Sequence, residues 1–484
     1  MKIIKIKTTM KHGKLFLVLL IHVGLFYSCV PTKDLQEANK NLPSNYNQQL
    51  ADTTNSAQLK WKDFFNDEHL TMLIDTALTN NQELRIMMQQ INVAQNEVKT
   101  RKGEYLPFIG YGLGAEVEKV GEYTRNGAVE KNLDIKEGEE FPEPLTDFSA
   151  GLFASWELDV WQKLRNSKKA AALEYLSTIE GKNFMVTRLI SEIADSYYEL
   201  IALDNQLAII EQNLELQGNA LKMVRLQKEA ARATELAVKR FEAEVLKNQS
   251  HKFEVQQEIV EIENKLNFLI GRQPQHIARN SEGFIETQMD TIYSGIPTQL
   301  LQNRPDIRQA EYELEAAKLN IKVARANFYP SIGIKAGVGL QAFNPKYLTE
   351  TPASLIYSAV GDVVGPLINR NAIKANYNTA NAKQVQAVYE FEKAILNGYI
   401  EVVNQLSKME NLKKSYDLKE SQVKALTESI DLSTRLFQSA RIEYIEVLLT
   451  QREALESKME LVETKKDQLM ARVNVYQALG GGWN

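Results

Sequence analysis

The chain has one cysteine, five histidines and twelve prolines in 484 residues. A lone cysteine excludes an internal disulfide framework, and the scattered histidines do not have the spacing of metal ligands. The sequence has neither a phosphate-binding loop nor a recognisable pair of nucleophile and base. The formal charge of −5 excludes the basic surface typical of a nucleic-acid-binding protein. We therefore predict no catalytic residue, no cofactor, no metal site and no nucleic-acid partner.

Long apolar runs are confined to the first thirty residues. After Val30 no stretch of 18 apolar residues occurs, so we predict that the mature chain has no transmembrane helix. Such a chain can cross a membrane only as β-structure. The mostly apolar run from Leu15 to Tyr27 follows several lysines, which predicts a signal peptide over residues 1–28.

The lone cysteine lies directly after this predicted signal peptide. The run Phe26-Tyr27-Ser28-Cys29 resembles a loose bacterial lipobox, in which the cysteine is acylated and becomes the mature N-terminus. We therefore predict that Cys29 is a lipid anchor, and a lipoprotein cysteine carries the several acyl chains that stable anchoring needs. The alternative is a plain signal peptide followed by an incidental cysteine.

An internal repeat decides the architecture. Residues 81–114 and 304–337 each contain an amphipathic helix, a proline and a strand of alternating apolar residues, at an offset of 223. Pro107 thus aligns with Pro330. The helices share a stripe of mostly apolar residues at three-four spacing: Leu84, Met87, Ile91, Ala94, Val98, Arg101 and Tyr105 in the first copy, and Ile307, Ala310, Leu314, Ala317, Ile321, Ala324 and Phe328 in the second.

Each copy continues with a pair of strands and then with very long helices. Apolar residues that alternate with small or polar ones predict four strands, in hairpins at about 108–160 and 331–368. The polar loop of the first hairpin, residues 121–146, is expected to have little structure of its own. Residues 166–228 contain no proline, and they predict a helix of roughly 90 Å.

Four strands are too few to close a membrane barrel, since single-chain bacterial barrels begin at about eight strands. An open sheet edge in lipid leaves backbone groups without partners, at roughly several kcal/mol each. The sequence therefore predicts that several chains contribute strands to one membrane β-barrel. The long, length-matched helices are expected to continue this barrel outside the membrane as an α-helical barrel.

These features resemble the TolC/OprM-type outer-membrane efflux proteins, in particular their NodT-like lipoprotein branch. The likeness covers nearly all of the mature chain, and it implies a homotrimer with a 12-stranded membrane barrel and a 12-helix periplasmic tunnel. The motifs that match are Ile296-Pro297 with Leu300-Leu301, Arg304-Pro305-Asp306-Ile307, Ala310-Glu311, Ala324-Arg325-Ala326, Phe328-Tyr329-Pro330-Ser331-Ile332, Trp156-Glu157-Leu158-Asp159 and Gly365-Pro366-Leu367.

The resemblance implies an outer-membrane exit duct of a tripartite efflux pump, through which cargo moves passively. Its partners are then a periplasmic adaptor protein, an inner-membrane transporter of the RND type and outer-membrane lipid. One alternative is a non-conducting coiled-coil lipoprotein scaffold, which explains the helices but not the four strands. Another is the exit duct of a type I secretion system. The cargo, whether drug, metal ion, amphiphile or polypeptide, stays open.

The repeat and the resemblance together divide the chain into segments. After the signal peptide we expect a lipidated lead with an equatorial segment, the first repeat, an equatorial linker, the second repeat and a short tail. A second offset, of 209, aligns Gly271 with Gly480 at the ends of the two repeats. The predicted boundaries are 29–66, 67–271, 272–300, 301–480 and 481–484.

The resemblance also implies two functional regions. Adaptor contacts are expected at the turns between the long helices, at Ala231-Arg232 and Ala440-Arg441. Relatives usually have glycine at these turns, and alanine costs roughly 1–2 kcal/mol in a left-handed conformation. A periplasmic gate is expected at Asp431, with Glu428 one turn earlier, because three carboxylates on one axis attract cations and repel one another. The other interpretation of Asp431 is a solvated surface charge.

Overall fold

The computed structural model describes residues 30–46, 53–366, 368, 370–439 and 441–483. The chain divides into two compact units. One contains the chain up to Glu37 together with Val93–Tyr175 and Glu313–Val388, and the other contains Ala38–Asn92, Leu176–Tyr312 and Tyr389–Asn484. Among the described residues, no helix is both long enough and apolar enough to span a bilayer.

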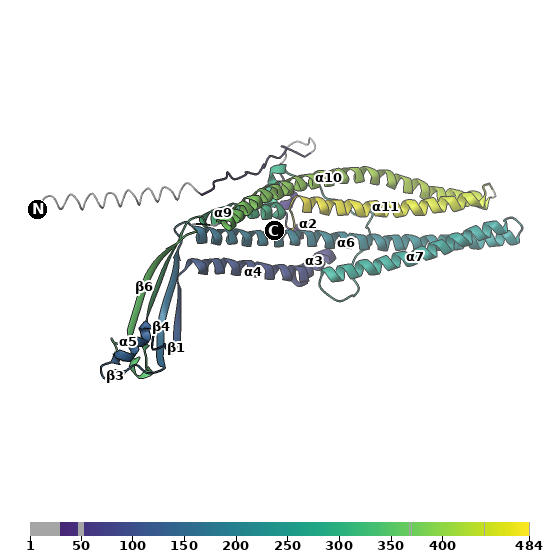
Figure 1. Ribbon diagram of the computed structural model, residues 1–484. Helices are drawn as coiled ribbons and strands as arrows, with labels where there is room; N and C mark the ends of the chain where they lie inside the picture. The colour runs from purple at the N-terminus through teal and green to yellow at the C-terminus, as the bar shows by residue number, and fades with distance from the viewer. Residues whose placement is uncertain (1–29, 47–52, 367, 369, 440, 484) are drawn as a thin grey trace. The chain divides into compact units, whose positions relative to one another are not determined.

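The first unit contains a four-stranded antiparallel sheet, visible with its long strands side by side in Figure 1. Its order is β1 (Phe108–Glu118), β4 (Leu145–Leu158), β5 (Ser331–Ala342) and β6 (Leu355–Val364). The pairing of β4 with β5, which places Leu152 opposite Val338, joins the two hairpins. The predicted four strands are therefore confirmed, and the strands of both repeats form one sheet.

The two faces of this sheet differ in chemistry. One face exposes large apolar side chains, including Leu113 (81% exposed) and Tyr357 (82% exposed). The neighbouring positions point the other way, because successive side chains of a strand alternate. That second face carries mainly small and polar residues on β1, β4 and β5: Gly110, Gly112, Gly114 and Glu116, then Asp147, Ser149 and Gly151, then Lys335, Gly337 and Gly339. It also exposes a few apolar side chains, including Phe153, Ile356 and Val360.

The first hairpin loop is folded, so the expectation that it has little structure is wrong. It contains α5 (Arg125–Asn132), β2 (Asp134–Lys136) and β3 (Glu139–Glu140). Thr124 caps α5 by accepting a hydrogen bond from the backbone N–H of Gly127, at 3.1 Å. Polar composition was a poor guide here, because capping residues and turns suffice for short elements on the surface.

Strand-to-helix junctions of the first unit are built from motif residues of the two repeats. Asp159 ends the Trp156–Asp159 motif and accepts hydrogen bonds from the backbone N–H groups of Leu164 and Arg165, both at 2.9 Å. The indole of Trp161 donates to the carbonyl of Pro330 at 2.7 Å and stacks on Tyr329, with centroids 4.5 Å apart. These contacts fix the direction in which the chain leaves the sheet.

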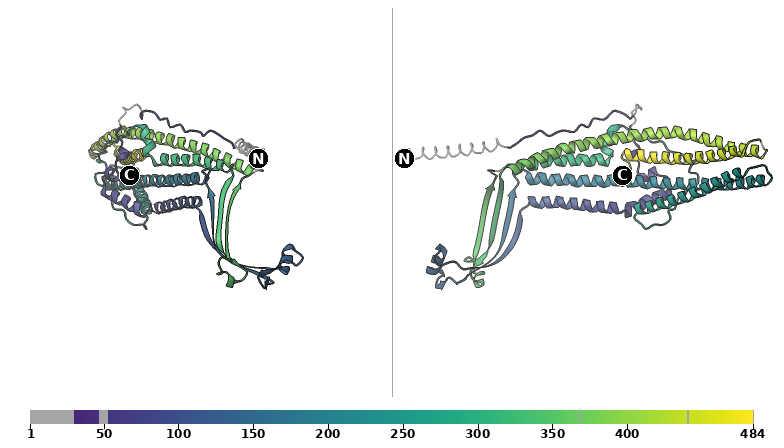
Figure 2. Two further views of the ribbon diagram at one scale, coloured as in Figure 1. Left: turned by 90° about the vertical axis from the view of Figure 1, so that its left-hand side faces the viewer. Right: turned by 45° about the vertical axis from the view of Figure 1, so that its right-hand side comes forward.

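The long helices form two matched pairs, α6 (Lys163–Glu229) with α7 (Glu235–Leu269) and α10 (Asn371–Gln438) with α11 (Tyr444–Ala478). The pairs are labelled in Figure 1, and Figure 2 shows them from two further directions. Helices α7 and α11 both have 35 residues, and their bounds differ by the offset of 209 that the sequence predicts. The long helices predicted for each repeat are confirmed.

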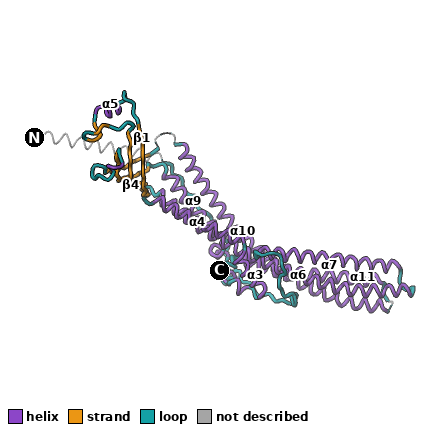
Figure 3. The backbone as a smooth tube through the Cα atoms, turned by 90° about the horizontal axis from the view of Figure 1, so that it is seen from below, coloured by secondary structure: helices purple, strands orange, loops and turns teal. Residues whose placement is uncertain are grey.

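Shorter elements complete the chain. They are η1 (Ser56–Gln58), α2 (Trp61–Phe64), α3 (Glu68–Asn80), α4 (Gln82–Tyr105), η2 (Pro297–Gln299), α8 (Leu300–Asn303), α9 (Pro305–Ala326) and η3 (Pro345–Tyr347). Figure 3, in which helices are purple and loops teal, labels α3, α4 and α9. Helices α4 and α9 carry the repeated stripe. They end at Tyr105, two residues before Pro107, and at Ala326, four residues before Pro330, and each proline disfavours helix in the residue before it.

The second unit has an aromatic core where its short and long helices meet. Phe64 of α2 stacks on Tyr476 of α11, with centroids 4.0 Å apart. The Tyr476 hydroxyl donates to the carbonyl of Leu59 at 2.6 Å, and the Tyr197 hydroxyl donates to Asp67 at 2.8 Å. Both hydroxyls are thus satisfied, which makes the burial of tyrosine favourable.

The described lead begins as an extended strap along α10. In the first unit, the backbone N–H of Lys33 donates to the Tyr377 hydroxyl at 3.1 Å. Gln36 exchanges two hydrogen bonds between its backbone and the Gln384 side chain, at 3.3 and 2.7 Å. Val30 belongs to the apolar cluster of α9 and α10 around Phe328. The strap therefore ties the start of the described chain to the helices just below the sheet.

Asp195 is a buried carboxyl that the sequence did not reveal. It lies on α6, and its charged and polar neighbours come from all four long helices: Glu192 on α6, Lys265 on α7, Lys408 on α10 and Asn474 on α11. Burial raises the pKa of Asp195 from its usual 3.8 to about 7, although the Asn474 hydrogen bond and the two lysines act in the opposite direction. One carboxylate oxygen is buried without a hydrogen-bond partner.

This raised pKa predicts a pH-dependent stability. The folded protein binds the Asp195 proton more tightly than the unfolded chain does, so its contribution is complete below about pH 4 and is lost as pH rises through about 7. We expect the substitution Asp195→Asn to raise the melting temperature at pH 8 and to change it little at pH 4. Melting curves between pH 4 and 9 test this, with the exposed Asp75→Asn as control. A pH-independent difference would contradict it.

Candidate functional site

The first helix turn, between α6 and α7, is built around a left-handed alanine. Ala231 has φ 56°. The backbone N–H groups of Ala231 and Arg232 donate to the carbonyls of Lys228 and Gln227, at 2.9 and 2.7 Å, which is the Schellman pattern that closes a helix C-terminus. Thr234 then caps α7 through the N–H of Ala237 at 3.2 Å. Ala231 thus occupies the position that glycine favours.

The second turn, between α10 and α11, has different side-chain contacts among its described residues. The N–H of Arg441 donates to the carbonyl of Leu436 at 2.9 Å, as Arg232 does to Gln227 in the first turn. Glu443 precedes α11 but makes no side-chain capping bond. Ion pairs of the first turn, such as Lys228 with Glu235, have no counterpart among the described residues of the second. The described parts of the two turns therefore share the backbone bond of Arg232 and Arg441 and differ in their side-chain contacts.

The two turns are held together by apolar packing. Phe241 of α7 is buried in a cluster with Leu221 and Val224 of α6. Phe437 and Tyr444, which flank the second turn, pack against this cluster. The rings of Phe241 and Tyr444 lie 6.4 Å apart. No spacing rule predicted this contact, because it joins residues that are about two hundred positions apart.

The left-handed Ala231 gives a direct test of the first turn. We expect Ala231→Gly to stabilise the turn by roughly 1 kcal/mol, because glycine adopts φ > 0 without the Cβ penalty. Hydrogen exchange at the backbone amides of Ala231 and Arg232 should slow accordingly. Ala230→Gly, next to it but without a positive φ, serves as the control and should slow nothing. Faster exchange in Ala231→Gly would contradict the assignment.

The predicted gate carboxylates lie near the end of α10. Glu428 and Asp431 are both exposed, and three positions separate them, so they share one face of the helix. Neither forms an ion pair with any described residue. A single chain therefore leaves both charges available to other chains or to ions. Ala231, Arg232 and Arg441, the predicted adaptor contacts that the structure describes, are likewise exposed.

A duplicated clasp fixes the opposite ends of α7 and α11. At the end of α7, the Asn81 amide donates to the carbonyl of Leu269 at 2.8 Å. At the end of α11, Arg304 donates to the carbonyl of Ala478 at 2.8 Å. The two pairs are equivalent under the repeat, since 81 aligns with 304 and 269 with 478. In each repeat, a hydrogen bond therefore joins the C-terminus of the last helix (α7 or α11) to the residue that precedes the helix with the repeated stripe (α4 or α9).

Comparison with known proteins decides the family. The family model described as "Outer membrane efflux protein" matches residues 73–272 and 296–481, so it covers most of the chain and both copies of the repeat. The chain belongs to the outer membrane efflux protein family. Its members are efflux channels of the outer membrane that extend into the periplasm, and they are not enzymes, as the sequence predicts.

The efflux protein has relatives of nearly equal length. It is 27% identical over 427 residues to the cation efflux system protein CusC of Escherichia coli O6:H1, covering 87% of this chain and 88% of the relative. It is 26% identical over 464 residues to the pyoverdine export outer membrane protein OpmQ of Pseudomonas aeruginosa, covering 95% of each. The probable outer membrane lipoprotein SilC of Salmonella typhimurium is 25% identical over 426 residues, covering 87% of this chain and 88% of SilC.

Solved structures share the fold of the efflux protein. A membrane protein from Pseudomonas aeruginosa superposes with a TM-score of 0.83 at 22% identity, covering 93% of this chain and 99% of the other. A CusC structure superposes with a TM-score of 0.79 at 24% identity, covering 94% and 100%. The predicted fold class and the resemblance are confirmed.

Two of the predicted site residues, Cys29 and Ala440, lie outside the described residues. The structure brings Ala231 and Arg232 together with the segment that flanks Arg441, through the Phe241 cluster. It places Glu428 and Asp431 on the helix that leads into this region. The residues that the sequence did not reveal are Thr234, Phe241 and Tyr444, which shape the turns.

Proposed function

We propose that three copies of the efflux protein form one conducting duct, anchored by an acylated Cys29. The sheet carries this proposal. Its outer strands are β1 and β6, and neither has a partner on its outer side among the described residues. Unpaired edges cost roughly several kcal/mol per backbone group in lipid, and joining β6 of one copy to β1 of the next removes them.

The exposed apolar side chains of the single chain support this assembly. The apolar face of the sheet, with Leu113 and Tyr357, suits lipid, whereas the face with glycine, serine and charged residues suits water. Large apolar side chains are also exposed along the long helices, including Phe253 on α7 and Leu418 on α10. Contact with neighbouring copies in a trimer would cover such side chains.

Native mass spectrometry of the detergent-extracted mature protein tests the assembly. We expect a trimer whose N-terminal peptide carries acyl chains on Cys29. Cys29→Ala should lose the acyl mass but still assemble, because the sheet edges and not the lipid hold the trimer together. A monomer that keeps its sheet would contradict the duct and favour the non-conducting scaffold.

At the periplasmic end, we propose that the two helix turns dock an adaptor protein, which couples the duct to an inner-membrane transporter of the RND type. The exposed Arg232 and Arg441 would form a ring of positive charge in a trimer. The relatives carry names for the export of cations and of pyoverdine. We infer that the transporter selects the cargo and that the duct conducts what it receives.

We further propose that Asp431 and Glu428 form an acidic gate. Three copies on one axis attract cations, so the open channel should be cation-selective. In planar bilayers with a salt gradient, Asp431→Asn is expected to move the reversal potential towards zero, and adding Glu428→Gln should move it further. Glu420→Gln, an exposed carboxylate earlier on α10, is the matched control. An unchanged reversal potential in the double variant would assign both residues to the solvated outer surface.

A further inference from the structure

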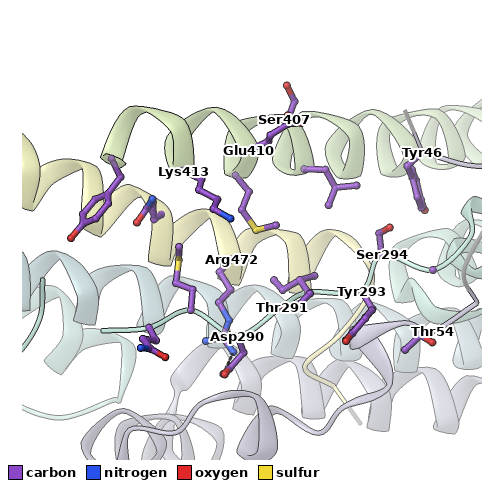
Figure 4. A pocket seen from close by; sticks show the side chains of 18 of the residues that line it. Tyr46, Thr54, Asp290, Thr291, Tyr293, Ser294, Ser407, Glu410, Lys413 and Arg472 are labelled. Carbon is purple, nitrogen blue, oxygen red and sulfur yellow. Dashed lines mark hydrogen bonds and ion pairs between the residues drawn. The ribbon is translucent and has the colours of Figure 1, made fainter. Parts of the chain in front are cut away.

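A groove of about 800 Å³ lies within the second unit, between α10, α11 and the linker segment 287–295. Figure 4 shows it from close by. Helix α11 contributes Lys465, Gln468 and Arg472, which are spaced by three and four positions and therefore share one face. A cavity of this size is in the range that binds drug-sized molecules.

The Lys465 ammonium is buried in this groove and forms no ion pair with any carboxylate that the structure describes. The residue is 5% exposed. Its Nζ donates to the backbone carbonyl of Thr287 at 2.5 Å and lies 5.0 Å from the centroid of the Tyr416 ring. An ammonium has three donors, so two remain after the bond to Thr287. Burial lowers the pKa of Lys465, and the carboxylates of Glu286 and Glu420 only partly oppose this.

The next residue of α11, Lys466, is about equally buried but has carboxylate partners. Lys466 is 7% exposed, but it pairs with Glu199 at 2.9 Å and also with Glu463. These partners raise the pKa of Lys466 in spite of its burial. A buried cation is costly when it is unpaired, so the absence of any such partner among the described residues around Lys465 calls for an anion from outside.

Other polar groups of the groove also have free capacity. The Arg472 guanidinium binds Asp290 through Nη2 at 3.0 Å, but its buried Nε has no hydrogen-bond partner within the described ranges. Tyr46 is 2% exposed, and its buried hydroxyl likewise has no partner among the residues that the structure describes. Figure 4 shows Arg472 beside Asp290 in the middle of the groove, Lys413 on its α10 side and Tyr46 at one end. Groups of this kind favour an acceptor-bearing ligand.

The rest of the wall is mixed. Apolar side chains come from α10 and from the linker segment, and they are Met289, Ile292, Leu406 and Met409. The carboxylates of Glu410 and Asp417 also line the groove, and Glu410 is paired with Lys414 at 2.7 Å. Apolar surface combined with a few placed polar groups is found in small-molecule sites. We propose that this groove binds an organic anion that carries a carboxylate on an apolar body of drug size. The carboxylate accepts hydrogen bonds from Lys465, and the apolar body covers Met409 and Leu406.

This site is separate from conduction. Every group named for it lies on one chain and in one unit, and neither Asp431 nor the helix turns take part. Evidence against the trimer or against the gate would therefore not contradict this site. Likewise, evidence against this site would not contradict the trimer or the gate.

Cholate tests the inference because it joins one carboxylate to a rigid apolar body. Calorimetric titration uses the full-length protein in lipid nanodiscs, with cholate below its micelle concentration and the neutral amide of cholate as comparison. We expect binding of cholate and, for Lys465→Met, a loss of affinity of roughly ten-fold or more, which is typical of a hydrogen bond to a charged group. Lys424→Met, an exposed lysine of α10 outside the groove, should bind cholate as the wild type does.

A second measurement covers the case in which Lys465→Met fails to fold. Reductive methylation with ¹³C-formaldehyde gives each lysine an NMR signal, and the signal that disappears in Lys465→Arg belongs to Lys465. Cholate should shift this signal, and the neutral amide should not. The proposal is overturned if cholate does not bind, if the amide binds equally well, or if the Lys465 signal stays in place.

Discussion

Replacing Gly480 by alanine is expected to destabilise the protein by about 3 kcal/mol, which combines the cost of a left-handed alanine with that of overpacking. Gly480 has φ +91° and ends α11 with a bond from its N–H to the carbonyl of Gln477 at 2.8 Å. A Cβ at this position would lie 2.5 Å from the carbonyl oxygen of Asn303. Because that atom belongs to backbone, it cannot rotate away as a side chain can.

The repeat provides a second case and a control for this prediction. Gly271 ends α7 in the same way, with φ +72° and a Cβ position 2.6 Å from the carbonyl oxygen of Asn80, so Gly271→Ala should cost about as much. Gly218 lies inside α6, and a Cβ there meets nothing within 4 Å. Gly218→Ala should therefore stabilise the helix by roughly 1 kcal/mol. Thermal unfolding of the three variants measures the differences. Equal melting temperatures would contradict the close packing of Gly480 and Gly271 against neighbouring backbone.

The elements that the sequence predicted well are those with a period or a repeat. Alternation along β1 and β5 and the proline that precedes each of them defined the strands, because the same physical pattern occurs twice. The offset of 209 predicted that α7 and α11 have equal length, and both contain 35 residues. Long helices that pack along their whole length cannot differ in length without losing contacts, whereas the hairpin loops are free to differ.

The parts that the sequence did not predict depend on contacts between distant segments. Asp195 looked like an ordinary helix carboxylate, and its raised pKa arises only because four helices converge on it. Lys465 and Lys466 are neighbours of the same type, but among the described residues only Lys466 forms ion pairs, with carboxylates from α6 and from its own helix. The first hairpin loop gave a local signal in Thr124, a capping residue placed three positions before Gly127, and this signal was outweighed by the polar composition.

Arg304 is the other residue whose loss should be severe. It is 4% exposed, and its guanidinium binds both oxygens of Asp306 at 3.0 and 2.7 Å, Glu401 at 2.7 Å and the carbonyl of Ala478 at 2.8 Å. Burial alone would lower the pKa of Arg304, but these carboxylates raise it, so the side chain stays charged. It therefore links α9, α10 and the end of α11 at one point.

We expect Arg304→Met to destabilise the protein by roughly 3–5 kcal/mol, because it leaves Asp306 partly buried without its partner and the carbonyl of Ala478 without its donor. Arg304→Lys should recover only part of this, since a lysine cannot hold the planar, bidentate pair with Asp306. Arg101→Gln is the matched control: Arg101 also bonds two carboxylates, Glu97 and Glu104, but at the surface, where such pairs contribute roughly 0–1 kcal/mol. Thermal unfolding in detergent compares the variants. If Arg304→Met had the same melting temperature as Arg101→Gln, the clasp at the end of α11 would contribute no stability. The Arg-Pro-Asp motif would then need an explanation outside the single chain.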